Sequence, residues 1–307
     1  MTDIYASEKK APTKLQQAIT PLLGALAGVV KTDPKHLKLL VACLLCRGHL
    51  LLEDAPGVGK TTLARALSQA LALRMKRLQC TPDLMPSDVT GISIYNAPEH
   101  KFQFMPGPVF TNILLADEIN RAPAKVQSAL LEAMAERQVT VGGVTRPLPE
   151  LFMVMATQNP IEQEGTYPLP EAQLDRFLLH VKIGYPDANS EQAILRLARG
   201  EAMNAANDID HPLSAEDILQ ARQEVLALHM SDAVEQYLVQ LIMATREPQA
   251  YGEDIASWIE YGASPRGTIA LDRCARAHAW LAGRDYVSPD DIKAVAHDVL
   301  RHRLLLS

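Results

Sequence analysis

The stretch that decides the fold is EDAPGVGKTT, at residues 53–62. It follows an apolar run at residues 50–52, which predicts a buried strand, and it precedes residues 63–67, which predict the start of a helix. A tight loop with two glycines between a strand and a helix lets backbone N–H groups converge on phosphate oxygens at the helix N-terminus. The stretch therefore predicts a phosphate-binding loop, although Asp54 stands where the usual pattern begins with glycine.

Residues of this loop have separate expected roles. Lys60 is expected to reach the β- and γ-phosphates of ATP, and the Thr61 hydroxyl is expected to bind Mg²⁺. A Gly-Lys-Thr turn that only joins two elements is the alternative, which the flanking strand and helix disfavour. The full set expected to contact ATP is Ala55, Pro56, Gly57, Val58, Gly59, Lys60, Thr61 and Thr62.

Two carboxylates follow a second apolar run. Residues 112–116 predict a strand, and Asp117 and Glu118 come directly after it. Asp117 is the candidate ligand of Mg²⁺ through water, and Glu118 is the candidate group that polarises the attacking water. Such a pair taken alone more often begins a solvated helix. Behind a phosphate-binding loop, it predicts the second half of a site for phosphoryl transfer.

Three more polar residues are candidates for the same site. Asn159 follows an apolar run at residues 151–156 and can hydrogen-bond a γ-phosphate oxygen or the attacking water; a plain Asn-Pro turn is the alternative. Arg176 and Arg266 are each an isolated arginine in a defined local context. An arginine directed at a γ-phosphate accelerates phosphoryl transfer by orders of magnitude, whereas an ordinary surface arginine contributes nothing to it.

The order of these elements resembles an AAA+ ATPase, and the details resemble the MoxR family. The resemblance implies that Asn159 is sensor 1, Arg266 is sensor 2 and Arg176 is the arginine finger. It also accounts for Asp54, because MoxR-like sequences commonly carry Glu-Asp at this point. The motifs that carry it are LLEDAPGVGKT at 51–61, ADEINR at 116–121, ATQNP at 156–160, LPEAQLDRF at 169–177 and ASPR at 263–266.

Two β-hairpins are expected between the core elements. Residues 91–108 predict two short strands with a turn at 96–99, and residues 138–146 alternate β-forming residues around a Gly-Gly pair. They resemble the helix-2 insert and the pre-sensor-1 hairpin of one AAA+ clade. In such proteins both hairpins tend to face the pore of a ring and touch substrate; plain surface hairpins are the alternative.

The predicted fold is α/β: an AAA+ P-loop αβα core with a five-stranded parallel sheet, followed by a small all-α lid domain. An N-terminal helical segment at residues 1–48 belongs to the core, residues 49–185 form the nucleotide-binding core, and residues 186–307 form the lid. The five strands are expected near residues 50–53, 75–80, 112–116, 151–156 and 178–183. Lid helices are expected at residues 190–199, 214–228, 232–245, 266–282 and 289–300.

Composition sets limits on this interpretation. The chain has 307 residues, 48% of them hydrophobic, and a formal net charge of −6, which disfavours non-specific nucleic-acid binding. No apolar run approaches the ~18–20 residues of a membrane span, and the N-terminus lacks the apolar core of a signal peptide, so a cytoplasmic location is expected. Cys43 and Cys46 form a C-x-x-C, but no second pair completes a zinc site, which favours buried thiols.

The resemblance also implies how subunits share an ATP site and what the hydrolysis of ATP is used for. Arg176 would complete the ATP site of a neighbouring subunit in a ring, most simply a hexamer, and Arg266 would touch the γ-phosphate of its own subunit. The expected function couples ATP hydrolysis to chaperone-like remodelling of a client protein complex, with a von Willebrand factor A domain protein as partner. The alternatives are a nucleic-acid motor of the helicase type, the motor subunit of a magnesium-chelatase-like complex, and a nucleotide switch that scarcely hydrolyses ATP.

Overall fold

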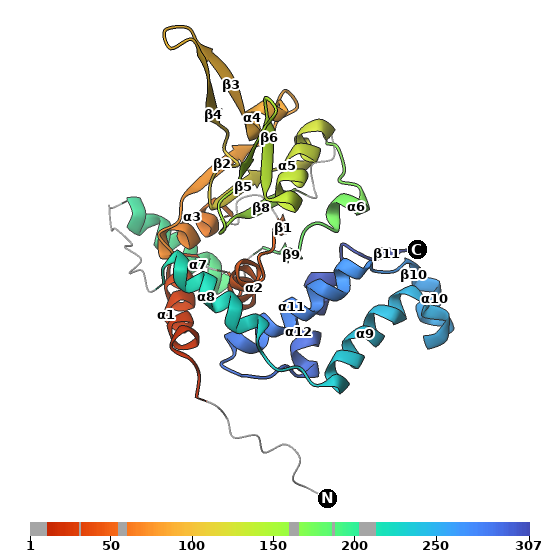
Figure 1. Ribbon diagram of the computed structural model, residues 1–307. Helices are drawn as coiled ribbons and strands as arrows, with labels where there is room; N and C mark the ends of the chain where they lie inside the picture. Colours follow the sequence, from red (N-terminus) through yellow and green to blue (C-terminus); the bar gives the residue numbers. More distant parts are fainter. Residues whose placement is uncertain (1–10, 31, 55–59, 160–165, 186–187, 203–212) are drawn as a thin grey trace, which may run out of the picture.

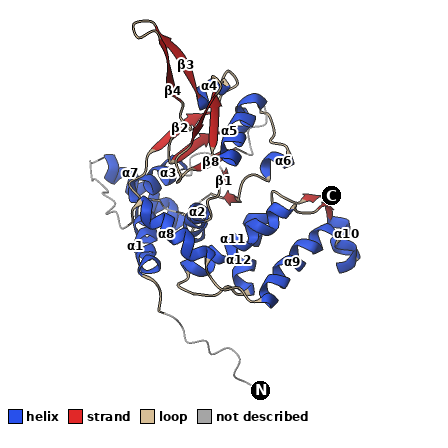
Figure 2. Cartoon of the chain, in the orientation of Figure 1, coloured by secondary structure: helices blue, strands red, loops and turns tan. Residues whose placement is uncertain are grey.

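The computed structural model describes residues 11–30, 32–54, 60–159, 166–185, 188–202 and 213–307 (Figure 1). Residues Ala55 to Gly59 of the expected phosphate-binding loop lie outside this set. Strand and helix follow each other along the core and helices dominate the C-terminal part, as Figure 2 shows. No described helix has the length and apolar character that crossing a membrane requires.

A parallel sheet of five strands forms the centre of the core, in the order β2-β5-β8-β1-β9. Every residue of β5 is buried, because neighbouring strands flank it and layers cover both faces of the sheet. The expectation of five parallel strands is confirmed, with each end within two residues of its predicted place. The strands are β1 Leu50–Asp54, β2 Met75–Gln79, β5 Ile113–Asp117, β8 Met153–Gln158 and β9 Leu179–Ile183.

The two faces of the sheet belong to two hydrophobic clusters. Leu50 and Leu52 of β1 pack into one cluster and Leu51 packs into the other, because successive side chains of a strand point to opposite faces. Helix α3 (Lys60–Ala70) lies in the first cluster and α5 (Ala124–Glu136) in the second. The first cluster continues into the C-terminal helices, so one face of the sheet shares its core with the lid.

The N-terminal helices α1 (Lys14–Val29) and α2 (Pro34–Leu45) connect the sheet to the lid. Helix α1 packs on α3 and also on the lid helices, where Gln16 Nε2 donates to the carbonyl oxygens of Trp280 (3.1 Å) and Arg284 (3.2 Å). Helix α2 is buried along its C-terminal half. The boundaries of the three predicted segments, 1–48, 49–185 and 186–307, stay a prediction.

The C-terminal part contains the five expected lid helices, with ends within three residues of their predicted places. It also contains two strands that were not expected: β10 (Ile259–Tyr261) pairs antiparallel with β11 (Leu305–Leu306). Strands of two or three residues are too short to show an alternating pattern, so the expectation of an entirely helical lid was wrong at this point. The helical elements are α7 Ala188–Ala202, α8 Ala215–Leu226, α9 Asp232–Arg246, η2 Pro248–Tyr251, α10 Glu253–Trp258, α11 Pro265–Leu281 and α12 Pro289–Leu300.

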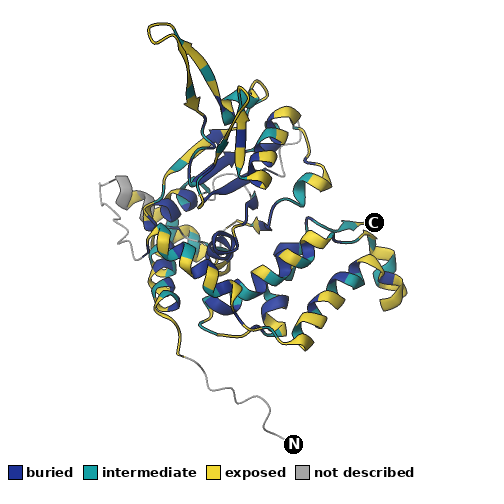
Figure 3. Ribbon diagram, in the orientation of Figure 1, coloured by how far each residue is buried: buried dark blue, intermediate teal, exposed yellow. Residues whose placement is uncertain are grey.

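Both predicted hairpins are present. Strands β3 (Gly91–Asn96) and β4 (Lys101–Pro106) follow the short helix α4 (Pro86–Thr90) and project beyond the sheet, and their outer surface is largely exposed (Figures 1 and 3). Strands β6 (Gln138–Val141) and β7 (Val144–Pro147) turn at Gly142-Gly143, whose φ angles of 60° and 75° require glycine.

Candidate active site

Residues that are predicted to bind the nucleotide lie at the carboxyl edge of the sheet. Lys60 opens α3 after β1, Asp117 ends β5, and Asn159 directly follows β8. Because parallel strands all end at one edge, these residues lie on the same side of the sheet. The pairing of Leu52 with Thr157 and of Gln79 with Asp117 aligns the strand ends. Asn159 is buried there, with 7% of its surface exposed.

Thr157 holds the two carboxylate residues in place. Its hydroxyl donates to Asp117 Oδ1 at 2.8 Å and accepts the backbone N–H of Glu118 at 2.8 Å. Glu118 has φ 57° and ψ 54°, a left-handed conformation that a non-glycine residue adopts only where its surroundings compensate. Thr157 is fully buried and was missed by the sequence reasoning. The available signal was its position directly after a predicted core strand and two residues before Asn159.

A basic side chain from the neighbouring strand pairs with the buried carboxylate. Arg77 of β2 donates to Asp117 Oδ2 from Nη2 at 2.5 Å and from Nε at 3.2 Å. Half of the Arg77 side chain is exposed, whereas Asp117 is nearly covered. Glu118 Oε2 lies 3.2 Å from Arg121 Nε and accepts a hydrogen bond from Gln79 Nε2 at 3.4 Å. Both carboxylates are therefore positioned by donors that the sequence reasoning did not single out.

The negative charges of these two carboxylates act on the nearby thiol of Cys80. Burial, together with the negative charges of Asp117 and Glu118, raises the pKa of Cys80 to about 12. Cys80 is consequently a neutral, inert thiol beside the site. All four cysteines are free and buried, which agrees with the expected packing role of Cys43 and Cys46.

The donor set at the carboxyl edge fits a magnesium ion. Carboxylate and hydroxyl oxygens are the ligands that Mg²⁺ prefers, and Asp117 and Thr61 supply one of each at this edge. Asp117 already engages Thr157 with one oxygen and Arg77 with the other. A magnesium ion held here would compete with Arg77 for Asp117, or would contact Asp117 through water.

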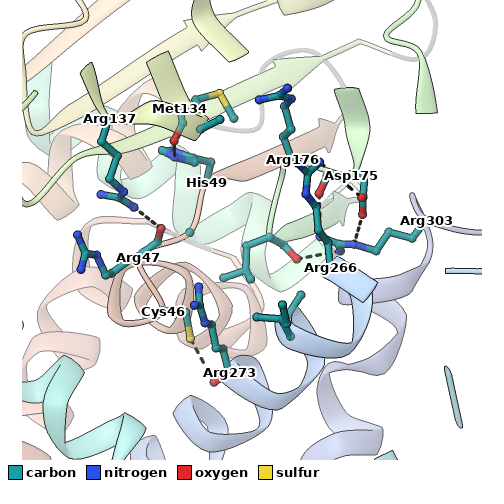
Figure 4. A pocket seen from close by; sticks show the side chains of 15 residues that line it. Cys46, Arg47, His49, Met134, Arg137, Asp175, Arg176, Arg266, Arg273 and Arg303 are labelled. Carbon is teal, nitrogen blue, oxygen red and sulfur yellow. Dashed lines mark hydrogen bonds and ion pairs between the residues drawn. The ribbon is translucent and has the colours of Figure 1, made fainter. Parts of the chain in front are cut away.

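The two candidate arginines lie at the opposite edge. Arg176 stands in the loop between α6 (Glu171–Leu174) and β9, and Arg266 lies in the first turn of α11. Both line a cavity of about 360 Å³ that is bordered by Gly48, His49 and Leu178, the residues directly before β1 and β9 (Figure 4). The cavity is therefore at the amino edge of the sheet.

This position bears on one expectation about Arg266. Lys60 follows the end of β1, and the cavity borders the start of the same strand, so the five residues of β1 separate them by ~16 Å at about 3.3 Å per residue. Arg266 was expected to touch the γ-phosphate of its own subunit, and in this arrangement it lies at the opposite edge of the sheet from Lys60. Arg266 instead shares the cavity with Arg176.

Asp175 ties this part of the lid to the core. Its Oδ2 accepts a hydrogen bond from Ser264 Oγ at 2.8 Å, and its Oδ1 accepts from Arg303 Nε at 2.8 Å. Ser264 also caps α11 by accepting the backbone N–H of Arg266 at 3.1 Å. Arg303 is almost fully covered and donates to the carbonyl oxygen of Phe177 at 2.6 Å as well. One carboxylate thus fixes the loop that carries Arg176 against the helix that carries Arg266.

Comparison with known families and structures agrees with this architecture. A model described as an ATPase family associated with various cellular activities (AAA) matches residues 49–179. A model of an AAA lid domain matches residues 253–306. A crystal structure of a candidate ATPase from Cytophaga hutchinsonii is similar with a TM-score of 0.89 and 46% identity, covering 95% of this chain and 88% of that one.

Two relatives are similar to the chain over most of its length. The chain is 47% identical over 295 residues to the uncharacterized protein YeaC of Bacillus subtilis, covering 95% of this chain and 89% of the relative. It is 46% identical over 280 residues to the chaperone MoxR1 of Mycobacterium tuberculosis, covering 91% of this chain and 73% of the relative. With the sheet order, the carboxyl-edge residues and the lid in place, these similarities show that the chain belongs to the MoxR family of AAA+ ATPases.

Proposed function

We propose that the protein is the ATP-driven motor of a chaperone-like system, working as a closed ring, most simply a hexamer. The observation that carries the proposal is the division of the candidate groups between two edges of one sheet. Lys60, Asp117 and Asn159 lie at the carboxyl edge, and Arg176 and Arg266 lie at the amino edge. Neither edge alone holds the full set of groups for phosphoryl transfer.

At the carboxyl edge, residues 55–62 bind the phosphates of ATP, with Lys60 on the β- and γ-phosphates. Thr61 and Asp117 hold Mg²⁺, which neutralises phosphate charge when bound. Glu118 polarises the attacking water, and Asn159 orients that water or a γ-phosphate oxygen. Thr157 keeps Asp117 and the Glu118 backbone at a fixed spacing.

At the amino edge, Arg176 and Arg266 serve the ATP of the next subunit. Head-to-tail contacts that bring the carboxyl edge of one subunit against the amino edge of the next generate a ring when the rotation closes. Arg176 acts as the arginine finger and Arg266 as sensor 2, both across the interface. ATP binding tightens the contact, and hydrolysis loosens it.

The hairpin surface favours a protein client over nucleic acid. Large apolar side chains are exposed on β3 and β4, among them Tyr95 (51%) and Phe102 (73%). The basic residues that nucleic-acid binding would need are engaged elsewhere, since Lys101 pairs with Glu99 at 2.7 Å and Arg146 lies over the Phe104 ring at 3.9 Å. The similarity to the chaperone MoxR1 supports the same choice.

Further partners and the location complete the proposal. The family resemblance favours a von Willebrand factor A domain protein as adaptor and a protein complex as client. Because the activity consumes ATP, we propose a cytoplasmic location. No described feature favours the motor of a magnesium-chelatase-like complex over this reading.

The experiment that tests the client class measures ATP hydrolysis with two additions. An unfolded polypeptide is expected to change the turnover rate, and single-stranded DNA is expected to leave it unchanged. Phe102→Ser, which changes only an exposed side chain, is expected to reduce the response to the polypeptide without changing the basal rate. A turnover rate that changes with DNA and not with the polypeptide would contradict the chaperone function and favour the nucleic-acid motor.

A further inference from the structure

The cavity at the amino edge carries far more positive charge than its neighbours balance. Asp175 is the one carboxylate among its described lining residues, and it is taken by Arg303 at 2.8 Å and faced by Arg266 at 3.7 Å. Among the described residues, the other four arginines that line the cavity form no ion pair with a carboxylate. These are Arg47, Arg137, Arg176 and Arg273.

Arg47 and Arg273 lie close enough to Arg137 for their positive charges to act on its guanidinium group. Burial lowers the pKa of Arg137, and the positive charges of Arg47 and Arg273 lower it further. Arg137 Nη2 donates to the carbonyl oxygen of Arg47 at 2.6 Å, but Nη1 is buried and finds no hydrogen-bond acceptor among the described residues. A buried cationic donor without an acceptor costs free energy. An anion bound in the cavity offsets the repulsion that the Arg137 guanidinium experiences from its two neighbours.

The three arginines come from separate elements. Arg47 follows the end of α2, Arg137 ends α5, and Arg273 lies on α11 of the lid, as Figure 4 shows. Planar guanidinium groups form paired hydrogen bonds to phosphate oxygens. A phosphate held by all three would therefore fix the core and the lid at one spacing.

We propose that the cavity binds the terminal phosphates of the ATP held by the neighbouring subunit, and that Arg47, Arg137 and Arg273 bind them together with Arg176 and Arg266. The inference rests on the proposed ring, which brings the carboxyl edge of one subunit against this cavity in the next. It adds three arginines to the two that the family motifs indicate, and it makes the cavity a detector of the γ-phosphate.

The test uses the double variant Arg47→Gln/Arg273→Gln. Both side chains are exposed, so their replacement leaves the fold intact, and the nucleotide loop of the same subunit is unchanged. Arg196→Gln, an exposed arginine on α7, is the matched control. Three quantities are measured: turnover, affinity for a fluorescent ATP analogue in dilute subunits, and assembly by sedimentation velocity in ATP and in ADP.

The double variant is expected to lose about tenfold or more of its turnover, since arginines at a γ-phosphate act on the transition state. Its affinity for the analogue is expected to match that of the control. Its assembly is expected to respond less to the difference between ATP and ADP. Subunits carrying Lys60→Ala, which keep an intact cavity, are expected to restore turnover when mixed with it under confirmed subunit exchange.

Two results would overturn the inference. Turnover and assembly equal to those of Arg196→Gln would mean that the cavity does not contact the phosphates. Loss of assembly in every nucleotide state would mean that the cavity binds acidic side chains of the neighbour instead. Wild-type protein that forms no ring or hydrolyses no ATP would refute the proposed function itself, before any variant is compared.

Discussion

At the scale of single residues, the Thr157 hydroxyl connects Asp117 to the backbone of Glu118. Thr157→Val keeps the shape and removes the hydroxyl, which leaves buried Asp117 Oδ1 and the Glu118 N–H without their shared partner. We expect a loss of about 1–3 kcal/mol in the free energy of unfolding and a turnover at least about tenfold lower. Urea unfolding and steady-state ATP hydrolysis measure the two effects. Thr157→Ser should retain both properties, and a fully active Thr157→Val would contradict the role.

The contact between Arg77 and Asp117 leads to a second prediction at this scale, about the Mg²⁺ concentration that ATP binding requires. Because its guanidinium holds Asp117 Oδ2, Arg77→Gln frees the carboxylate for Mg²⁺. We expect the magnesium concentration for half-maximal binding of an ATP analogue to fall by up to about fivefold, the size of one partly exposed ion pair of at most ~1 kcal/mol. Arg74→Gln, an exposed arginine just before the start of the same strand, is the control. An unchanged or higher magnesium requirement would show that Arg77 does not compete with the ion.

The buried imidazole of His49 leads to a third prediction, about how the free energy of unfolding depends on pH. Burial lowers its pKa to about 3, with help from the Arg137 charge, and the neutral ring accepts the Val154 N–H at 3.0 Å. The unfolded chain binds a proton near pH 6.5 and the folded chain does not, so stability falls as pH drops from about 6.5 towards about 3. In His49→Gln the slope of unfolding free energy between pH 5 and 6 should shrink by about 1.4 kcal/mol per pH unit. An unchanged slope would mean that His49 titrates normally.

The motif residues could be predicted from the sequence because each lies within a short contiguous pattern. The contacts that Thr157 and Arg77 make with Asp117 could not, since they depend on which strands are neighbours. Asp117, Arg77 and Thr157 belong to β5, β2 and β8, which are adjacent only through the strand order of the sheet. A chain read in one dimension contains no direct record of that order.

At the scale of elements, Asp175 joins the core to the lid. Asp175→Asn removes the charge that compensates nearly covered Arg303, and breaking a buried ion pair in this way costs about 3–5 kcal/mol. We expect a loss of this size in thermal or chemical unfolding. Glu171→Gln, an exposed carboxyl four residues before Asp175, should change stability little. Equal stability of the two variants would contradict the role of Asp175.

Long elements were predictable for a physical reason, and short ones were not. Strands β1, β5 and β8 contain apolar runs, and the Gly142-Gly143 turn encodes its own hairpin. Strands β10 and β11 have only three and two residues. They pair because α12 returns the chain end beside residues 259–261, which is a consequence of tertiary packing.

At the scale of the whole molecule, the groups that a complete ATP site requires are divided between two edges of the sheet. The nucleotide residues and the arginine cavity lie at opposite edges of one subunit. The sequence indicated both groups but contained no information on the orientation of the lid, so it could not assign Arg266 to either edge of the sheet. The orientation follows from contacts between distant segments, such as Ser264 with Asp175 and Arg303 with Phe177.

The most direct test of the central claim, that two subunits share each ATP site, is the rate of ATP hydrolysis per subunit against protein concentration. Molecular mass is measured in parallel, with and without ATP. A rate per subunit that rises with concentration together with an ATP-dependent ring is the result that the shared site predicts. Hydrolysis by a monomer at a rate per subunit independent of concentration would contradict it, because Arg176 and Arg266 would then have no neighbour to serve.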